Sequence, residues 1–267
     1  MRRRPAVSGQ FYYGDPQRLT AQIEGLIPKG VIRERAIGAL CPHAGLIYSG
    51  HVAGAVYSSI LLPKTFVLIG PNHTGLGPRL SLWSGDEWEI PTGTFMIDKK
   101  LSHRIAQEAR LIEKDSQAHL YEHSLEVQLP FIGHLKPDAR IVPIVAMYAS
   151  LDELKETAEG IARAIKEIGY DVVIVASSDM SHYLPDNIAR KKDNLAIERI
   201  LALDPEGLYE TIKKHDISMC GYMPAIIMLY ASIMLGAREA RLVKYSTSGE
   251  VSGDLSQVVG YAGIIVK

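Results

Sequence analysis

Continuous apolar runs separated by helical patterns are the feature of the sequence that most constrains its fold. The runs lie at 36–41, 65–70, 140–147, 171–176, 241–246 and 257–266. Helical patterns lie between them at 49–61, 98–109, 151–168, 187–203, 205–215 and 223–236. Strands without polar alternation are typical of a sheet that is buried on both faces. The order therefore predicts an α/β fold whose mostly parallel central sheet is flanked by helices.

The domain organisation follows from the absence of any internal repeat, low-complexity tract or Pro/Gly/Ser-rich linker. We expect one domain over residues 1–267, near the upper size limit for a single core. The stretch 80–97 alternates around two turn signals, Gly85-Asp86 and Pro91-Thr92-Gly93. It predicts a hairpin excursion from the main sheet.

Charge and hydropathy exclude several function classes. The chain has 29 Lys and Arg against 30 Asp and Glu, which argues against nucleic acid or an acidic membrane as a partner. We expect the basic cluster Arg2-Arg3-Arg4 to be a solvated terminus. No secretory signal is apparent, and the most apolar stretch, 222–235, contains Pro224 and is too short to span a bilayer. The expected location is therefore the cytoplasm.

Three histidines follow apolar runs: His43, His73 and His182. Ligands of open α/β sheets bind at the carboxyl ends of the strands, and imidazole is a common ligand for Zn, Cu and Fe. Each of these histidines could instead be an ordinary hydrogen-bonded loop residue. Their equivalent positions favour a metal site.

Two further residues near these runs have alternative interpretations. Asp179 precedes His182 by three residues and could orient its imidazole, bind metal or cap a helix. Cys220 precedes a helical pattern, where a thiol with a lowered pKa favours thiolate, although a small buried hydrophobic residue is the commoner fate of cysteine. Cys41 lies inside an apolar run and is expected in the core.

The segment 119–123 matches H-x-x-E-H, the inverted zincin pattern. On a helix, His119 and His123 would share a face, with Glu122 as general base. Pro130 would end that helix soon afterwards. A zinc protease is therefore a remote alternative. The pair His123 and Glu126 offers another interpretation, because a carboxylate can fix the tautomer of a histidine.

The same segments resemble the Memo family over essentially the whole chain and in the same order. The most specific match is EHSLEVQLP at 122–130. The others are RPAVSG at 4–9 followed by Phe11-Tyr12, PHAGLIYSG at 42–50, GPNH at 70–73, SSDMSH at 177–182, Cys220-Gly221, 249–254 and VGYAG at 259–263.

This resemblance implies a fold like the catalytic subunit of class III extradiol dioxygenases. It also implies a metal pocket made by His43, His73 and Cys220, with Asp179 and His182 beside it and His123 lining it. In the related dioxygenases the third ligand is a carboxylate, so the cysteine departs from their pattern and puts ring cleavage in doubt. A thiolate shifts the expected metal toward copper or a different iron chemistry, and zinc stays possible.

Two main functions follow as expectations. The first is a metal-dependent oxidoreductase acting with O2 or a small redox substrate, in which His182, Asp179 and His123 would be catalytic. The second is a non-catalytic protein that binds metal or a peptide on the same fold. The resemblance further implies radical-SAM and Ammecr-type proteins as partners, because microbial family members are often encoded beside them.

Overall fold

The apolar runs form the centre of a twelve-stranded mixed sheet in a computed structural model that describes residues 1–267. The sheet's main path runs from β1 (Arg2–Arg3) through β5 (Glu87–Ile90), β6 (Gly93–Ile97), β8, β3, β9, β2 and β12 to β10 (His182–Leu184). The strands that correspond to predicted runs are β2 (Gly38–Cys41), β3 (Thr65–Pro71), β8 (Arg140–Ala146), β9 (Val172–Ser177), β11 (Ala240–Thr247) and β12 (Val258–Val266). Every predicted run is therefore a strand, with boundaries that differ by one or two residues.

The core of this sheet is parallel, as predicted. Strand β9 lies between β3 and β2 and pairs with both in parallel register, while β8 pairs in parallel with the far side of β3. Strand β12 turns antiparallel against β2 and also pairs with β11 and with β10 (His182–Leu184). The sheet is consequently mixed but mostly parallel through its buried centre.

The predicted hairpin excursion is only partly correct. Strands β5 (Glu87–Ile90) and β6 (Gly93–Ile97) do form an antiparallel hairpin. However, β4 (Leu80–Trp83) pairs with β8 and with β7 (Glu113–Asp115) instead of joining that hairpin. The hairpin also accepts β1 (Arg2–Arg3) along its outer side. The N-terminus is thus part of the sheet.

The long helices begin and end where capping chemistry allows. In α6 (Leu151–Ile168), Ser150 and Glu153 form a reciprocal capping box, and Gly169 ends the helix in the left-handed conformation. The other predicted helices are α2 (Leu46–Ser59), α3 (Lys99–Glu108), α7 (Asp186–Leu201), α8 (Pro205–His215) and α9 (Tyr222–Met234). Sequence analysis did not predict α1 (Pro16–Leu26), α4 (Gln117–Leu120), α5 (Leu129–Leu135) or α10 (Gly249–Ser252).

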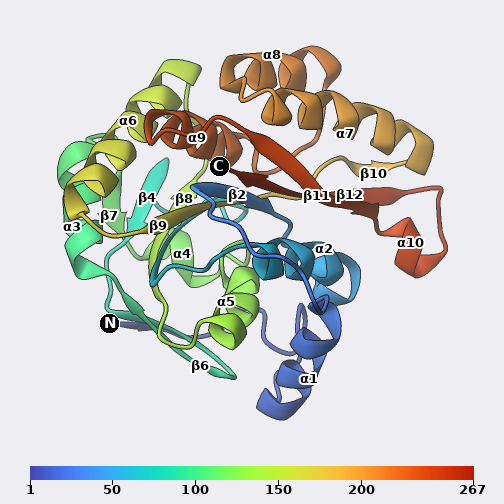
Figure 1. Ribbon diagram of the computed structural model, residues 1–267, viewed down its shortest axis with the longest axis horizontal. Coiled ribbons are helices and arrows are strands. Elements are labelled where there is room, and N and C mark those ends of the chain that lie inside the picture. Colours follow the sequence, from blue (N-terminus) through green and yellow to red (C-terminus); the bar gives the residue numbers. More distant parts are fainter.

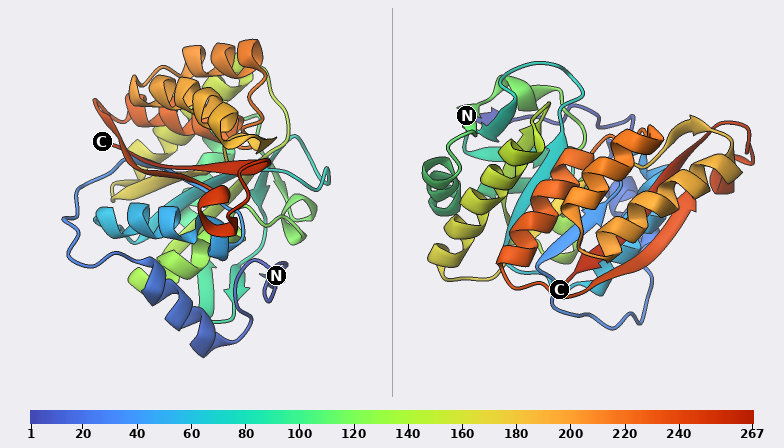
Figure 2. Two further views of the ribbon diagram at one scale, coloured as in Figure 1. Left: turned by 90° about the vertical axis from the view of Figure 1, so that its right-hand side faces the viewer. Right: turned by 90° about the horizontal axis from the view of Figure 1, so that it is seen from above.

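Two hydrophobic cores lie on opposite faces of the sheet. Helices α6 to α9 cover one face, and α1, α2 and α5 cover the other (Figures 1 and 2). Alternate residues of one strand enter different cores: Val67 packs with the first group of helices, whereas Phe66 and Leu68 pack with the second. This explains why the central strands are apolar at every position. The molecule is a single α/β domain, and none of its helices has both the length and the apolar character needed to cross a bilayer.

Candidate metal centre

Three neighbouring strands end at the same edge of the sheet, and the predicted ligands His43 and His73 lie just beyond two of them. His43 lies two residues beyond β2, and His73 lies two residues beyond β3. Strand β9, between them, ends at Ser177. Because these strands are parallel, their carboxyl ends lie side by side. Of the three histidines that the sequence predicts to meet, the topology brings together His43 and His73, whereas His182 is not among the clustered donors.

A third imidazole completes the group. One ring nitrogen from each of His43, His73 and His123 lies within 4.8 Å of the others. The rings of His73 and His123 stack at 4.6 Å between centroids, and His43 stands edge-on to both at 5.3 and 5.4 Å. His43 is almost wholly buried, whereas the other two side chains are 34% and 22% exposed. The group is thus open on one side and could hold a metal ion.

The carboxylate of Glu122 contacts two of these histidines, His73 and His123. It accepts a hydrogen bond from the Nδ1 of His73 at 2.9 Å, and also from the backbone N–H groups of His73 and Ser124 at 2.5 and 2.8 Å. It also lies 3.5 Å from the Nδ1 of His123. Metal-binding histidines commonly donate their second nitrogen to a carboxylate in this way. The arrangement leaves the Nε2 of His73 free for a ligand.

The electrostatics keep two of the three imidazoles neutral. Burial lowers the pKa of His43 well below its ordinary value, and the neighbouring histidines lower it further. Burial likewise lowers the pKa of His123, against the opposing charge of Glu122. For His73, burial acts in the same direction, but the hydrogen bond and charge of Glu122 outweigh it and raise the pKa. Neutral imidazole is the form that binds metal, so the donor set fits a transition metal such as Zn, Cu or Fe.

Cys220, predicted as the third ligand, lies beside this group but outside it. Its Sγ is 3.3 Å from the Nε2 of His43 and accepts a hydrogen bond from the N–H of Asp179 at 3.3 Å. The expectation of a lowered thiol pKa is wrong: burial raises the pKa of Cys220, and the carboxylate of Asp179 raises it further. His123 takes the third position among the clustered donors. A role for Cys220 as a ligand stays a prediction.

The proposed pairing of Asp179 with His182 is not present. Asp179 instead accepts hydrogen bonds from the backbone N–H groups of His43 and Ala44, at 2.8 and 3.3 Å. His182 begins β10, and its Nδ1 contacts the carbonyl oxygen of Ser218 at 2.9 Å. Burial raises the pKa of Asp179 to about 6, although those two N–H donors oppose the shift. The Asp179 carboxylate therefore fixes the backbone that carries His43.

The inverted zincin hypothesis is wrong. Helix α4 ends at Leu120, so His119 and His123 do not share a helical face. His119 is fully buried, and its Nε2 contacts the hydroxyl of Ser81 at 3.0 Å. Glu122 is engaged by His73 rather than free to act as a general base. The H-x-x-E-H pattern therefore does not form a protease site, although Glu122 and His123 both belong to the centre.

The N-terminal arginine cluster is not a solvated terminus throughout, because Arg3 is completely buried. Its guanidinium donates to the carbonyl oxygens of His119 and Glu122, at 2.6 Å each, and pairs with Glu126 at 2.6 Å. Glu126 also accepts from the hydroxyl of Tyr12 at 2.6 Å. The predicted pairing of Glu126 with His123 is therefore absent, and Glu126 instead ties the segment 119–128 to the N-terminus.

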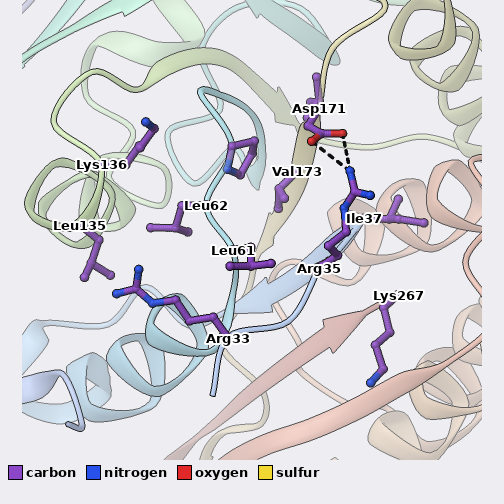
Figure 3. Close-up of a pocket in the computed structure, with 13 residues that line it drawn as sticks. Arg33, Arg35, Ile37, Leu61, Leu62, Leu135, Lys136, Asp171, Val173 and Lys267 are labelled. Carbon is purple, nitrogen blue, oxygen red and sulfur yellow. Dashed lines mark hydrogen bonds and ion pairs between the residues drawn. The ribbon is translucent and has the colours of Figure 1, made fainter. Parts of the chain in front are cut away.

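A cavity of about 630 Å³ lies at the opposite edge of the sheet, where β3 and β9 begin (Figure 3). Arg35 and Asp171 pair across its rim, and Ile37, Leu62 and Val173 form part of its apolar lining. It contains no histidine, cysteine or hydroxyl-bearing side chain. The group of three clustered donors that could hold a metal ion lies at the histidine edge instead.

Comparison with known proteins assigns the family. The model of the family described as Memo-like protein matches residues 3–265. The chain belongs to the Memo family. It is 45% identical over 267 residues to a MEMO1 family protein of Methanosarcina barkeri, covering 99% of this chain and 100% of that one. A MEMO1 family protein of Aquifex aeolicus is 44% identical over 267 residues, covering 98% of each chain.

The fold of this Memo-family chain also has a more distant likeness. The crystal structure of an uncharacterized protein from Escherichia coli K12 superposes with a TM-score of 0.52 at 14% identity. The match covers 86% of this chain and all of the other. At that identity the likeness concerns the fold alone.

Two residues of the centre had roles that the sequence pattern did not reveal. His123 was associated with the pocket only through the family resemblance, and Glu122 was assigned to a protease. The adjacent Glu122 and His123 carry one local signal, because such a pair offers both a possible ligand and a carboxylate that can support a metal-binding histidine, which here is His73. The loop 121–125 has no helical or strand periodicity that could have placed either side chain.

Proposed function

We propose that this Memo-family protein is a metal-dependent oxidoreductase that acts on a small redox substrate or O2 at the edge formed by His43, His73 and His123. The observation that carries the proposal is the convergence of three imidazole nitrogens within 4.8 Å. It is supported by the Glu122 carboxylate behind the group, which has the usual position of a partner for metal-binding histidines.

Different residues around the centre would bind the metal and contact the substrate. His43, His73 and His123 would hold the ion, and the Cys220 thiol beside His43 is positioned to join them or to contact a substrate. A bound iron or copper ion would supply one-electron chemistry and Lewis acidity. His182, partly exposed and held by Ser218, is available to move a proton to or from a substrate.

The test is anaerobic purification followed by elemental analysis of the wild type and of a His73→Ala variant. We expect iron, copper or zinc at close to one ion per chain in the wild type and a large loss in the variant. His103→Ala is the matched control, because His103 lies at an exposed position of α3 and is not one of the three clustered histidines. Equal metal content in all three proteins would refute the site.

Activity is a separate test from metal content. The loaded protein should consume O2 or oxidise a member of a panel of catechols, thiols and quinols, and Cys220→Ser should change the rate or the metal preference. Loaded protein that gives no turnover with any of these substrates would contradict an oxidoreductase while leaving the metal site intact.

A non-catalytic peptide-binding role is the second candidate, because the loops of the centre carry exposed large side chains. Tyr121 is 69% exposed next to Glu122, and Tyr183 is 72% exposed next to His182. Aromatic side chains in this setting are typical of binding surfaces. Saturable binding of a peptide that Tyr121→Ser and Tyr183→Ser weaken, without turnover, would favour this candidate over the oxidoreductase.

A further inference from the structure

Buried polar side chains, linked to one another by hydrogen bonds, lie behind the ring of His43 and have no role in the proposed function. Behind the ring lie Ser177 at the end of β9, Gln128 at the end of the 3-10 turn Glu126–Gln128, and Tyr57 in α2. All three are fully buried. Burying a neutral polar side chain costs free energy unless its hydrogen bonds are made, so each contact among these side chains is informative.

The orientation of the Gln128 amide is determined by its neighbours. Its Nε2 donates to the carbonyl oxygen of Pro42 at 2.9 Å, and a carbonyl can only accept. Its Oε1 accepts from the hydroxyl of Tyr57 at 2.9 Å. The second Nε2 proton then points at the Oγ of Ser177, also at 2.9 Å. The amide cannot be reversed without losing the Pro42 contact.

The proton count at Ser177 then fixes the tautomer of His43. A serine hydroxyl has one proton and two acceptor positions. The proton is donated to the carbonyl oxygen of Ser124 at 2.7 Å, and one acceptor position is filled by Gln128. The remaining acceptor position faces the Nδ1 of His43 at 2.8 Å. The Nδ1 must therefore carry the proton, and the lone pair resides on Nε2.

We propose that Ser177 and Gln128 are positioning residues that hold His43 as its Nδ1–H tautomer and so present the Nε2 lone pair to the centre. The consequence for metal affinity rests on the proposed function, but the tautomer itself does not. The Nε2 is also the atom that lies 3.3 Å from the Cys220 thiol. Gln128 holds both the backbone before His43 and the hydroxyl beneath its ring, so it sets the position and the protonation of the same ligand.

The tautomer can be read directly in the metal-free protein. NMR of protein labelled at the histidine nitrogens separates a protonated ring nitrogen from one with a lone pair, and His43→Gln assigns the signal. We expect a protonated Nδ1 and an unprotonated Nε2 at neutral pH. In Ser177→Ala, Nδ1 loses its acceptor, and the two nitrogen signals should move toward values averaged over both tautomers. Ser232→Ala, a buried serine in α9, is the matched control.

Affinity for Zn(II), used as the probe, provides the second readout. Ser177→Ala should weaken binding by about 10- to 100-fold, the usual effect of removing the partner of a ligating histidine. Tyr57→Phe tests the far end of these linked side chains: it leaves the Pro42 contact of Gln128 intact and should have a smaller effect in the same direction.

The outcomes separate this proposal from the proposed function. A protonated Nε2 in the wild type, or a Ser177→Ala spectrum like that of the wild type, would overturn the positioning role even if metal binds. The expected tautomer in a protein that binds no Zn(II), iron or copper would uphold the positioning role and overturn the metal centre. Unfolding of Ser177→Ala would be recognised from the whole spectrum. The Zn(II) affinity of Tyr57→Phe would then decide: a weaker affinity than that of the wild type supports the positioning role, and an unchanged affinity contradicts it.

Discussion

Glu122 engages the ligand His73 through both its backbone N–H and its ring. Glu122→Gln keeps the shape of the side chain but removes its negative charge. We expect metal affinity to fall by about 10- to 100-fold, measured by competition with a chromogenic chelator. Glu113→Gln, at an exposed position in β7, should bind metal as the wild type does. An unchanged affinity for Glu122→Gln would mean that the carboxylate does not support the ligands.

His119 should make the protein sensitive to acid. Burial lowers its pKa to about 3, and the charge of Arg3 acts in the same direction. Above its ordinary pKa of about 6.5, His119 is neutral in both the folded and the unfolded protein. Below it, only the unfolded chain takes up the proton, so this residue should lower the free energy of unfolding by about 1.4 kcal/mol per pH unit until the pH reaches its folded pKa.

The measurement is urea denaturation of wild type and His119→Gln between neutral and mildly acidic pH. The variant should lose less stability on acidification, whereas His103→Gln, at an exposed position, should follow the wild type. Parallel pH profiles for all three proteins would show that His119 is not held neutral.

At the residue scale, prediction from sequence succeeded where a side chain follows a strand directly. His43 and His73 were found because the end of a parallel strand fixes where the next residues lie. Glu122 and the burial of Arg3 were missed, because both depend on a loop and a terminus meeting across the fold. Nothing local in RRR at 2–4 distinguishes the buried arginine from its two neighbours.

At the scale of elements, the short strand β1 acts as a clamp on the loop that carries His123. Arg3 enters from β1, stacks on Trp88 of the hairpin and binds the carbonyl oxygens of His119 in α4 and of Glu122 in the loop. Arg3→Met should therefore cost about 3–5 kcal/mol, because it leaves Glu126 charged and buried without its partner. The loss is measurable as a lower midpoint in chemical denaturation.

Arg2 provides the control for this prediction, since it neighbours Arg3 in the same strand but pairs with Glu87 at the surface. Exposed ion pairs contribute little to stability, so Arg2→Met should unfold close to the wild-type midpoint. A similar loss in both variants would attribute the effect to β1 pairing rather than to the buried guanidinium.

Helices were predictable because their apolar patterns are long and periodic, and central strands because their apolar runs are continuous. The amphipathic pattern of α6 and its capping residues are complete within the segment itself. The partner of β4 was not predictable in this way. Its four residues are all buried and carry no signal that distinguishes the adjacent hairpin from β8 as its neighbour.

At the scale of the whole molecule, metal binding and folding should be coupled. An ion that binds only the native arrangement of His43, His73 and His123 stabilises it by mass action, with about 2.7 kcal/mol expected at a free ion concentration 100 times the dissociation constant. Thermal unfolding with increasing Zn(II) should show a rising midpoint for the wild type and a flat one for His73→Ala. A rise of equal size in both would indicate binding elsewhere.

The position of β9 between β2 and β3 has a consequence for the order of events during synthesis. All three imidazoles, with Glu122 and Gln128, precede residues 172–177 in the chain and are synthesised first, and until β9 is made β2 and β3 have no strand to join them. A nascent chain of that length carries the donors without their spacing. The protein should therefore bind an ion only late in synthesis, after β9 has paired with β2 and β3. Chains that end before β9 should release the ion that the full-length protein retains.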